Sequence, residues 1–386
     1  METKQKAKVL HIITSLGAGG AQAMLCKILE RLVGSTTAHE VLQLSGEDDY
    51  LAQLDSLGIP VFSLNMHAGR PSLRAVARLR KHVAQSRPDL IQGWMYHGNL
   101  AAEVARTLHR GKVPTVWNIR HSIDALTDEK RITRWIMRLG ARISRRPIGI
   151  IYNSRIAAGQ HESIGYDASK RVVIANGFDT ARFEFSQAAR DRMRTGLGID
   201  EDTFLVGMVG RNHPIKDHSN LIESAILLSG RKPDIRYIIA GSGTDSAEST
   251  YYARIAIAGL LNQFHFLGEY EDIPALMSTI DVLVLPSKGE GFPNVLGEAM
   301  ACERPCIATA VGDCAMIVGD CGMVVPPRDS TALADAIQSM CEKSVAERLD
   351  IGRRARQRIE QNYTIAQIAN QYAALYESIL NVEIPS

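Results

Sequence analysis

Short apolar runs alternate with stretches of helical pattern along the whole chain. The first series of candidate strands is Val9–Ile13, Val41–Leu44, Leu90–Gln92, Thr115–Asn118 and Ile148–Asn153. The second series is Val172–Ala175, Leu205–Val209, Arg236–Ala240, Phe264–Leu267, Val282–Leu285, Cys306–Thr309 and Met323–Val325. Strands that alternate with helices form parallel, doubly wound sheets, and this many strands require two sheets. We therefore predict an α/β protein with two such sheets.

The clearest domain boundary is the turn-forming stretch Asn176-Gly177-Phe178-Asp179. With 386 residues the chain is too long for one small core. We predict an N-terminal domain at 1–178, a C-terminal domain at 179–364 and a final segment at 365–386. That segment carries an amphipathic helix from about Ile365 to Leu380. The helix could pack on its own domain or cross back to the first, and the sequence leaves both open.

The composition excludes several functional classes. A net charge of only +2 argues against wholesale binding of nucleic acid. No apolar run approaches the roughly 20 residues that span a bilayer. The N-terminus is polar, and the apolar stretch after it is broken by His11 and by glycines, which indicates a first strand and not a signal peptide. We expect a cytoplasmic protein.

The six cysteines are not spaced as paired C-x-x-C knuckles. Several lie among apolar residues, where a reduced and buried thiol is the ordinary case. We predict no structural zinc and no disulfides.

Two glutamates frame a turn in the segment Glu290-Gly291-Phe292-Pro293-Asn294-Val295-Leu296-Gly297-Glu298, which follows an apolar run. The run predicts a buried strand, and we expect Asn294 to cap a helix that begins at Val295 and carries Glu298 in its first turn. Amides at such a helix start stabilise an anion, and ligands of open α/β sheets bind at the carboxyl ends of the strands. Amides for a diphosphate and carboxylates for hydroxyl groups suit a sugar nucleotide.

Two cations, Arg211 and Lys216, lie in the loop after another buried strand. Arginine offers a fork of donors and lysine a point charge, so together they could clamp a diphosphate. The alternative is a pair of solvated loop cations. The glycine-rich loop at Gly241 follows the next strand and would lie on the same rim.

The first domain has three candidate ligand segments. The first strand is followed by a loop with Gly17, Gly19 and Gly20, which could bring backbone amides close to a ligand or form a plain strand-to-helix turn. His97 and His121 each follow a strand at the carboxyl rim, where each could reach a substrate or be a structural histidine.

A basic segment extends from Lys130 to Arg146 and interleaves arginines with apolar residues that include Trp135. On a helix this pattern gives a basic face and an apolar face. It indicates either a surface helix or contact with an anionic membrane.

Taken together, these motifs resemble glycosyltransferase family 4, a group of retaining sugar-nucleotide transferases with the GT-B fold. The E-x7-E pair with Gly-Phe-Pro after its first glutamate, the Gly-Arg…Lys-Asp loop and the N-terminal Gly-Gly loop carry the resemblance. The turn at 176–179 and the segment 308–313, followed by Gly322 and Pro326, match in order. The resemblance covers nearly the whole chain.

The resemblance implies two Rossmann-like domains that face each other across a cleft, with the donor held mainly by the second. Arg211 and Lys216 would then hold the diphosphate. Glu298 would accept from the ribose hydroxyls, and Glu290 would lie by the transferred sugar.

Amides from Phe292 to Val295 would contact the sugar and phosphate, and Gly17 to Gly20 would close over them from the other domain. His121 resembles a histidine that approaches the donor sugar. We expect His97 to be among the residues that bind the substrate. The expected catalytic groups are Glu290, His121, Lys216 and Arg211. Around Trp94 to His97 and at Arg120-His121 the family pattern is followed only loosely.

The implied reaction moves a hexose-type sugar from a nucleoside diphosphate sugar, UDP being favoured, to a glycan or lipid-linked acceptor. The leaving phosphate would act as base, and no metal would be needed. A peripheral place at the inner face of the cytoplasmic membrane would fit the basic segment. The alternatives are a sugar-nucleotide epimerase or a phosphorylase of the same fold, and a non-catalytic sugar-nucleotide-binding module.

Overall fold

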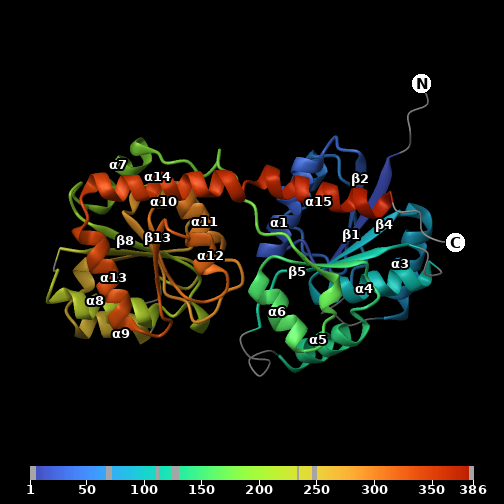
Figure 1. Cartoon of the computed structure of the whole chain (residues 1–386), viewed down its shortest axis with the longest axis horizontal. Coiled ribbons are helices and arrows are strands. Elements are labelled where there is room, and N and C mark those ends of the chain that lie inside the picture. The colour runs from blue at the N-terminus through green and yellow to red at the C-terminus, as the bar shows by residue number, and fades with distance from the viewer. Residues whose placement is uncertain are drawn as a thin grey trace. The chain divides into compact units, whose positions relative to one another are not determined.

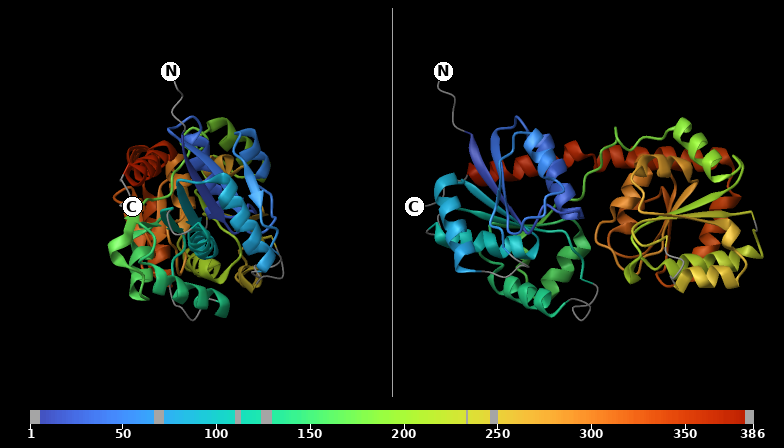
Figure 2. Two further views of the ribbon diagram at one scale, coloured as in Figure 1. Left: turned by 90° about the vertical axis from the view of Figure 1, so that its right-hand side faces the viewer. Right: turned by 180° about the vertical axis from the view of Figure 1, so that it is seen from behind.

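The computed structural model describes residues 6–66, 72–109, 113–123, 130–232, 234–245 and 250–381. The chain divides into two compact units (Figures 1 and 2). Unit 1 consists of Met1–Gly177 and Ile365–Ser386, and unit 2 consists of Phe178–Thr364. The division falls one residue before the boundary expected from the sequence, and the C-terminal helix belongs to unit 1.

Unit 1 contains one parallel sheet, which has seven strands within the described residues, in the order β3-β2-β1-β4-β5-β6-β7. The strands are β1 (Ala7–Ile13), β2 (Thr37–Gln43), β3 (Val61–Ser63), β4 (Leu90–Trp94), β5 (Thr115–Ile119), β6 (Gly149–Tyr152) and β7 (Arg171–Val173). The helices are α1 (Gly20–Leu32), α2 (Leu51–Ser56), α3 (Leu73–Ser86), α4 (Met95–Leu108), α5 (Arg131–Ile143), α6 (Arg155–Ser163) and α15 (Ile365–Leu380).

Alternation of side chains along the first strand builds the core of unit 1 on both faces of the sheet. Val9 and Ile13 of β1 pack in one cluster with residues of α1 and α15. Leu10 and Ile12 point to the other face and pack with residues of α3 and α4. This is the pattern of a sheet covered by helices on both sides (Figure 1).

Unit 2 contains a second parallel sheet, with six strands in the described part of the chain, in the order β10-β9-β8-β11-β12-β13. The strands are β8 (Leu205–Val209), β9 (Arg236–Ala240), β10 (Phe264–Gly268), β11 (Val282–Leu285), β12 (Cys306–Thr309) and β13 (Gly322–Val325). The helices are α7 (Gln187–Leu197), α8 (His218–Ser229), α9 (Thr250–Ile257), α10 (Ile273–Thr279), α11 (Asn294–Ala301), α12 (Cys314–Val318), α13 (Ser330–Glu342) and α14 (Val345–Asn362).

Each strand predicted from the sequence coincides with a strand of the structure, which confirms the doubly wound α/β class. β3 was not predicted, because it is only three residues long and its side chains are half-buried or exposed. β7 was grouped with the second series, but it pairs with β6 and forms an edge of the first sheet. The predicted C-terminal helix at Ile365–Leu380 has those bounds in α15.

Both sheets have a topological switch point, where the strand order reverses. In unit 1 the switch lies between β1 and β4, and in unit 2 it lies between β8 and β11. Ligands of doubly wound sheets bind at the carboxyl ends of the strands on either side of this point. The loops that follow these strands are therefore the first places to look for a site.

The cysteines are all free, and Cys26, Cys302, Cys306, Cys314 and Cys321 are buried, whereas Cys341 is partly exposed. Burial raises the pKa of the Cys26 thiol to about 12, so this thiol stays protonated at neutral pH. No helix among the described residues is long and apolar enough to cross a membrane.

Candidate active site

The switch point of unit 2 brings two of the predicted residues into direct contact. Lys216 lies in the loop after β8, and its Nζ is 2.6 Å from Oε1 of Glu290 in the loop after β11. The same carboxylate oxygen accepts a hydrogen bond of 2.6 Å from the hydroxyl of Ser287. Both ends of the ion pair are largely shielded from solvent, with side-chain exposures of 20% for Lys216 and 10% for Glu290.

Close packing of backbone supports the loop that carries the two cations. A Cβ on Gly241, which has φ +140°, would lie 2.3 Å from the carbonyl oxygen of Gly210 and 2.9 Å from the amide nitrogen of Arg211. The amide of Asn212 donates to the carbonyl of Ser242 at 2.8 Å. Gly241 thus supports the loop after β8, and the Arg211 side chain in that loop is exposed.

A second glycine fixes the loop that carries the first glutamate. Gly312 has φ +51°, and a Cβ there would lie 2.2 Å from the carbonyl oxygen of Glu290 and 2.6 Å from that of Gly291. The amide of Asp313 donates to the Gly291 carbonyl at 2.9 Å. Any larger residue at Gly312 would push the Glu290 loop away.

The helix after this loop differs from the prediction by one residue. Asn294 is the first residue of α11 and not its cap, because Pro293 occupies the N-cap position with an extended backbone (φ −72°, ψ 115°) and no side-chain cap bond is formed. The amides of Asn294 and Val295 still lie at the start of the helix, where its dipole favours an anion. Glu298 lies on the same short helix and is partly exposed.

Phe292 has a structural side chain. Its ring is only 5% exposed. It packs against Phe178 at 6.2 Å and Tyr363 at 5.6 Å between ring centroids. Close by, a Cβ on Gly297 would lie 2.1 Å from the Phe178 ring. Only the backbone of Phe292 is therefore placed to contact a ligand.

In unit 1, acidic side chains that the sequence did not single out lie against the glycine loop after β1. A Cβ on Gly17 would lie 2.5 Å from Oε2 of Glu47, and one on Gly19 would lie 2.5 Å from Oε1 of Gln22, whereas one on Gly20 would meet no atom within 4 Å. The amide of Ala18 donates to Asp49 Oδ2 at 2.6 Å. A carboxylate thus already accepts from one loop amide.

The strand-to-helix turn after β4 is strained at Met95, a non-glycine residue with φ +60°. The turn allows α4 to pack tightly on the sheet, since a Cβ on Gly98 would lie 2.3 Å from the Ile12 carbonyl oxygen. His97 lies in the first turn of α4 and is partly buried. Burial lowers the pKa of His97 below its usual value, which favours the neutral imidazole.

His121 follows β5 and is linked to a chain of buried groups. Its Nδ1 is 3.1 Å from the hydroxyl oxygen of Tyr96 on α4. That oxygen is 2.8 Å from Nε2 of His161 on α6, and Nδ1 of His161 is 2.7 Å from the carbonyl oxygen of Ala157.

The structure therefore gathers the predicted residues into two groups, one in each unit. The unit 2 group contains Lys216 and Glu290 in contact, with Arg211, Gly241 and the start of α11 on neighbouring loops. The unit 1 group contains the glycine loop, His97 and His121. Sequence reasoning named Gly312 and Tyr96 only as parts of motifs, without a supporting role. It missed the other residues that support these groups, which are Ser287, His161, Glu47 and Asp49. A serine before a loop, or a tyrosine inside a helix, carries no signal of its own in one sequence.

Among the described residues, no group of three or more His, Cys, Asp or Glu side chains is arranged to hold a metal ion. That the reaction needs no metal stays a prediction.

Two family models match the chain, one in each unit. The description "Glycosyl transferase 4-like domain" matches residues 19–177, and "Glycosyl transferases group 1" matches residues 203–343. The solved structure of Anabaena HepE, in complex with UDP and glucose, is 25% identical and aligns with a TM-score of 0.82 over 96% of this chain and 100% of HepE.

Two relatives extend these matches over most of the chain. EpsF of Bacillus subtilis (strain 168), itself a candidate glycosyltransferase, is 29% identical over 322 residues, which cover 80% of this chain and 80% of EpsF. The lipopolysaccharide core biosynthesis mannosyltransferase LpsB of Rhizobium meliloti (strain 1021) is 29% identical over 293 residues, which cover 70% of this chain and 81% of LpsB.

Two doubly wound parallel sheets, together with these matches, define a glycosyltransferase with the GT-B fold. Within that class, the matched models and relatives show a glycosyltransferase 4-like protein.

Proposed function

We propose that the protein transfers a hexose from a nucleoside diphosphate sugar to a glycan or lipid-linked acceptor, with retention of the anomeric configuration. The observation that carries the proposal is the contact between Lys216 and Glu290 at the switch point of unit 2. The contact supports the proposal because it brings a cation, which could bind the diphosphate, next to a carboxylate, which could bind the sugar, at the edge where ligands of this fold bind.

The roles we propose follow from the charges at this point. Lys216 and Arg211 bind the diphosphate with the amides at the start of α11, and they offset the charge that develops on the leaving phosphate. Glu298 accepts hydrogen bonds from the ribose hydroxyls, which as charge-assisted bonds contribute roughly 1.5–3 kcal/mol each. Glu290 orients the sugar and holds Lys216.

The proposed step needs no nucleophile from the enzyme. The bond between the sugar C1 and the phosphate oxygen breaks, and the acceptor oxygen forms the new bond to C1 on the same face. The acceptor's hydroxyl proton passes to the leaving phosphate oxygen, which is the base. We propose that this step is independent of a metal, and activity that persists in EDTA is the expected outcome.

The donor we propose is a UDP-sugar, because the HepE structures contain UDP, with glucose in one case and as UDP-glucose in another. The acceptor we propose belongs to a bacterial surface polysaccharide or glycolipid. This choice is supported by LpsB, whose name places it in lipopolysaccharide core biosynthesis.

We also propose that α5 contacts an anionic membrane from the cytoplasmic side. The helix buries Ile136 and Met137 and leaves Ile132 and Trp135 exposed by 72% and 64%. Exposed arginines continue along it and just after it, at Arg131, Arg138, Arg142, Arg145 and Arg146. Exposed apolar side chains can insert into such a surface. The cations around them are attracted to anionic lipid, and each contributes about 1 kcal/mol of binding free energy.

Nucleotide protection tests the donor assignment. UDP should raise the midpoint of thermal unfolding more than GDP does, because binding to the folded state alone stabilises it. Glu298→Ala should lose most of this shift, whereas Asp335→Ala, which removes an exposed carboxylate of unit 2, should keep it. Equal shifts in wild type and Glu298→Ala would remove the ribose role of Glu298.

Incubation with UDP-sugars in the absence of acceptor separates transfer from epimerisation. A transferase should leave the donor intact or hydrolyse it slowly. Rapid conversion into a second sugar nucleotide without hydrolysis would refute the transferase proposal.

Vesicle binding tests the membrane contact. Vesicles with anionic lipid should retain the wild type at low salt, and Trp135→Ser should weaken retention. Ile257→Ser, at a position 87% exposed in unit 2, is the matched control and should not. A wild type that is not retained would eliminate the membrane contact.

A further inference from the structure

The protons along the chain from Ala157 to His121 can be placed from the hydrogen-bonding capacity of each group. The carbonyl oxygen of Ala157 can only accept, so Nδ1 of His161, 2.7 Å away, must carry a hydrogen. His161 is fully buried, and burial lowers its pKa to about 4, so its ring is neutral at pH 7. Its Nε2 therefore has a lone pair and no hydrogen.

The next two links follow from this lone pair. The hydroxyl hydrogen of Tyr96 must point to Nε2 of His161, which is 2.8 Å away. A phenol has one hydrogen, so toward His121 the same oxygen can only accept. Nδ1 of His121, 3.1 Å from that oxygen, must then supply its own hydrogen.

We infer that Tyr96 and His161 are positioning residues that hold a hydrogen on Nδ1 of His121 and leave the lone pair of that ring on Nε2. The second ring nitrogen of a histidine takes the role that the hydrogen bond of the first one leaves to it. In this tautomer Nε2 of His121 carries a lone pair, which can accept a hydrogen bond from a hydroxyl group.

This inference deepens the proposed function and rests on it in one respect. If His121 contacts the donor sugar, the neutral ring accepts from a sugar hydroxyl through Nε2 and does not donate to it. The assigned tautomer itself depends only on unit 1.

The surroundings of His161 provide a matched control. The ring of Tyr166 packs edge-on against His161 at 5.2 Å between centroids, and Tyr152 lies at 5.5 Å. Tyr166 is as buried as Tyr96, with exposures of 5% and 6%. Tyr166→Phe thus removes a buried hydroxyl from the same cluster without removing a link of the chain from Ala157 to His121.

The test is the 15N spectrum of the histidine rings in the full-length protein at pH 7 to 8, with His121 assigned by its loss in His121→Asn. Wild type should show His121 with a hydrogen on Nδ1. Tyr96→Phe should shift His121 toward the other tautomer, and Tyr166→Phe should leave it unchanged. A wild-type ring with its hydrogen on Nε2, or equal changes in both variants, would overturn the inference.

Kinetics then connect the tautomer to the reaction. Tyr96→Phe should lower kcat/KM for the donor about tenfold, and Tyr166→Phe should change it less than twofold. Equal losses in both variants would count against a positioning role. If the wild type shows the assigned tautomer but transfers no sugar from any nucleotide donor, the proposed function fails and the tautomer assignment stands.

Discussion

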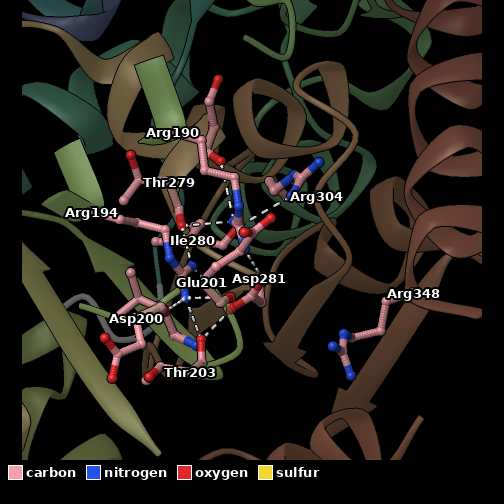
Figure 3. Close-up of polar contacts among 12 residues, drawn as sticks. Arg190, Arg194, Asp200, Glu201, Thr203, Thr279, Ile280, Asp281, Arg304 and Arg348 are labelled. Atoms are coloured by element: carbon pink, nitrogen blue, oxygen red, sulfur yellow. Dashed lines mark hydrogen bonds and ion pairs between the residues drawn. The ribbon is translucent and has the colours of Figure 1, made fainter. Parts of the chain in front are cut away.

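The two edges of the unit 2 sheet differ in how many protein acceptors surround their cations. At the edge where the strands begin, Asp281 pairs with Arg190 at 2.8 Å and with Arg194 at 3.4 Å (Figure 3). Its carboxylate also accepts from the amide of Leu205 at 2.7 Å. Arg194 is 3% exposed and donates to the backbone carbonyls of Thr279, Asp200, Glu201 and Thr203. These guanidinium groups donate their hydrogen bonds to acceptors within the protein.

At the opposite edge, where the strands end, the cations have much less protein around them. Lys216 has Glu290 as its ion-pair partner, and Arg211 is exposed. A cation whose donors are already taken by backbone carbonyls contributes to stability, whereas one with donors to spare can bind a ligand. The number of protein acceptors around a cation thus distinguishes the structural arginines of the amino edge from the cations that we propose bind a ligand at the carboxyl edge.

The largest effect should come from removing Asp281, the carboxylate that pairs with both arginines at the amino edge. Asp281→Ala removes the carboxylate that pairs with Arg190 and Arg194, and breaking a buried pair in this way costs about 3–5 kcal/mol. Unfolding in urea measures the loss. The control is Asp335→Ala, which breaks an ion pair to Arg231 with side chains 46% and 61% exposed and should cost about 0–1 kcal/mol. Similar losses in both variants would mean that the amino edge does not support the fold as described.

At the carboxyl edge the effect should fall more on catalysis than on stability. Lys216→Ala removes a donor to the leaving phosphate and should lower kcat by about 10²–10³, or roughly 3–4 kcal/mol of transition-state stabilisation. The variant should also lose some stability, because Glu290 is largely shielded from solvent, but less than Asp281→Ala loses, because Glu290 keeps the hydroxyl of Ser287 as a donor. Steady-state kinetics and urea unfolding on the same variant measure both. A variant that is unstable but has normal kcat would reverse the comparison.

The same contrast explains what the sequence could and could not predict. β11 was found because a buried parallel strand is a continuous apolar run. Lys216 and Glu290 were found because a charged loop residue after such a strand has a defined place at the carboxyl edge. Ser287 was missed because its partner is set by loop packing, and His161 because helix α6 brings it to Tyr96 only in the folded chain. The residues next to Ser287 and His161 in the sequence do not indicate these contacts.

A buried histidine at the carboxyl edge makes a pH-dependent prediction. His218 is 4% exposed, and burial lowers its pKa from 6.5 to about 4, while its hydrogen bond to Gly210 acts in the other direction. Between pH 6.5 and 4 the unfolded chain binds a proton at His218 that the folded chain does not, so stability falls as the pH drops through this range. From pH 7 to pH 5 the loss due to His218 should be about 2 kcal/mol.

Comparison with His218→Gln isolates this contribution from the other buried histidines. Urea unfolding at both pH values should show that the wild type loses about 2 kcal/mol more than the variant, whereas between pH 8 and pH 7 the two should change alike. The arginines of the amino edge keep their charge throughout this range and should not contribute. An equal loss in both proteins would show that His218 is not held neutral.

The smallest effect should come from Ser287, an uncharged residue that holds Glu290 by a hydrogen bond. Its hydroxyl donates to Glu290 Oε1 at 2.6 Å, and its carbonyl accepts from the Thr309 hydroxyl at 2.6 Å. Ser287→Ala removes one of the two groups that fix this carboxylate while Lys216 still holds it, so kcat should fall by less than about tenfold, near 1 kcal/mol. Thr309→Val is the matched control, because it loosens the same loop through its backbone without touching Glu290. Ser287→Ala could instead lower kcat as much as Lys216→Ala does. The orientation of Glu290 would then matter more for catalysis than the charge of Lys216, and the contrast between the two edges would rest on the carboxylate and not on the cations.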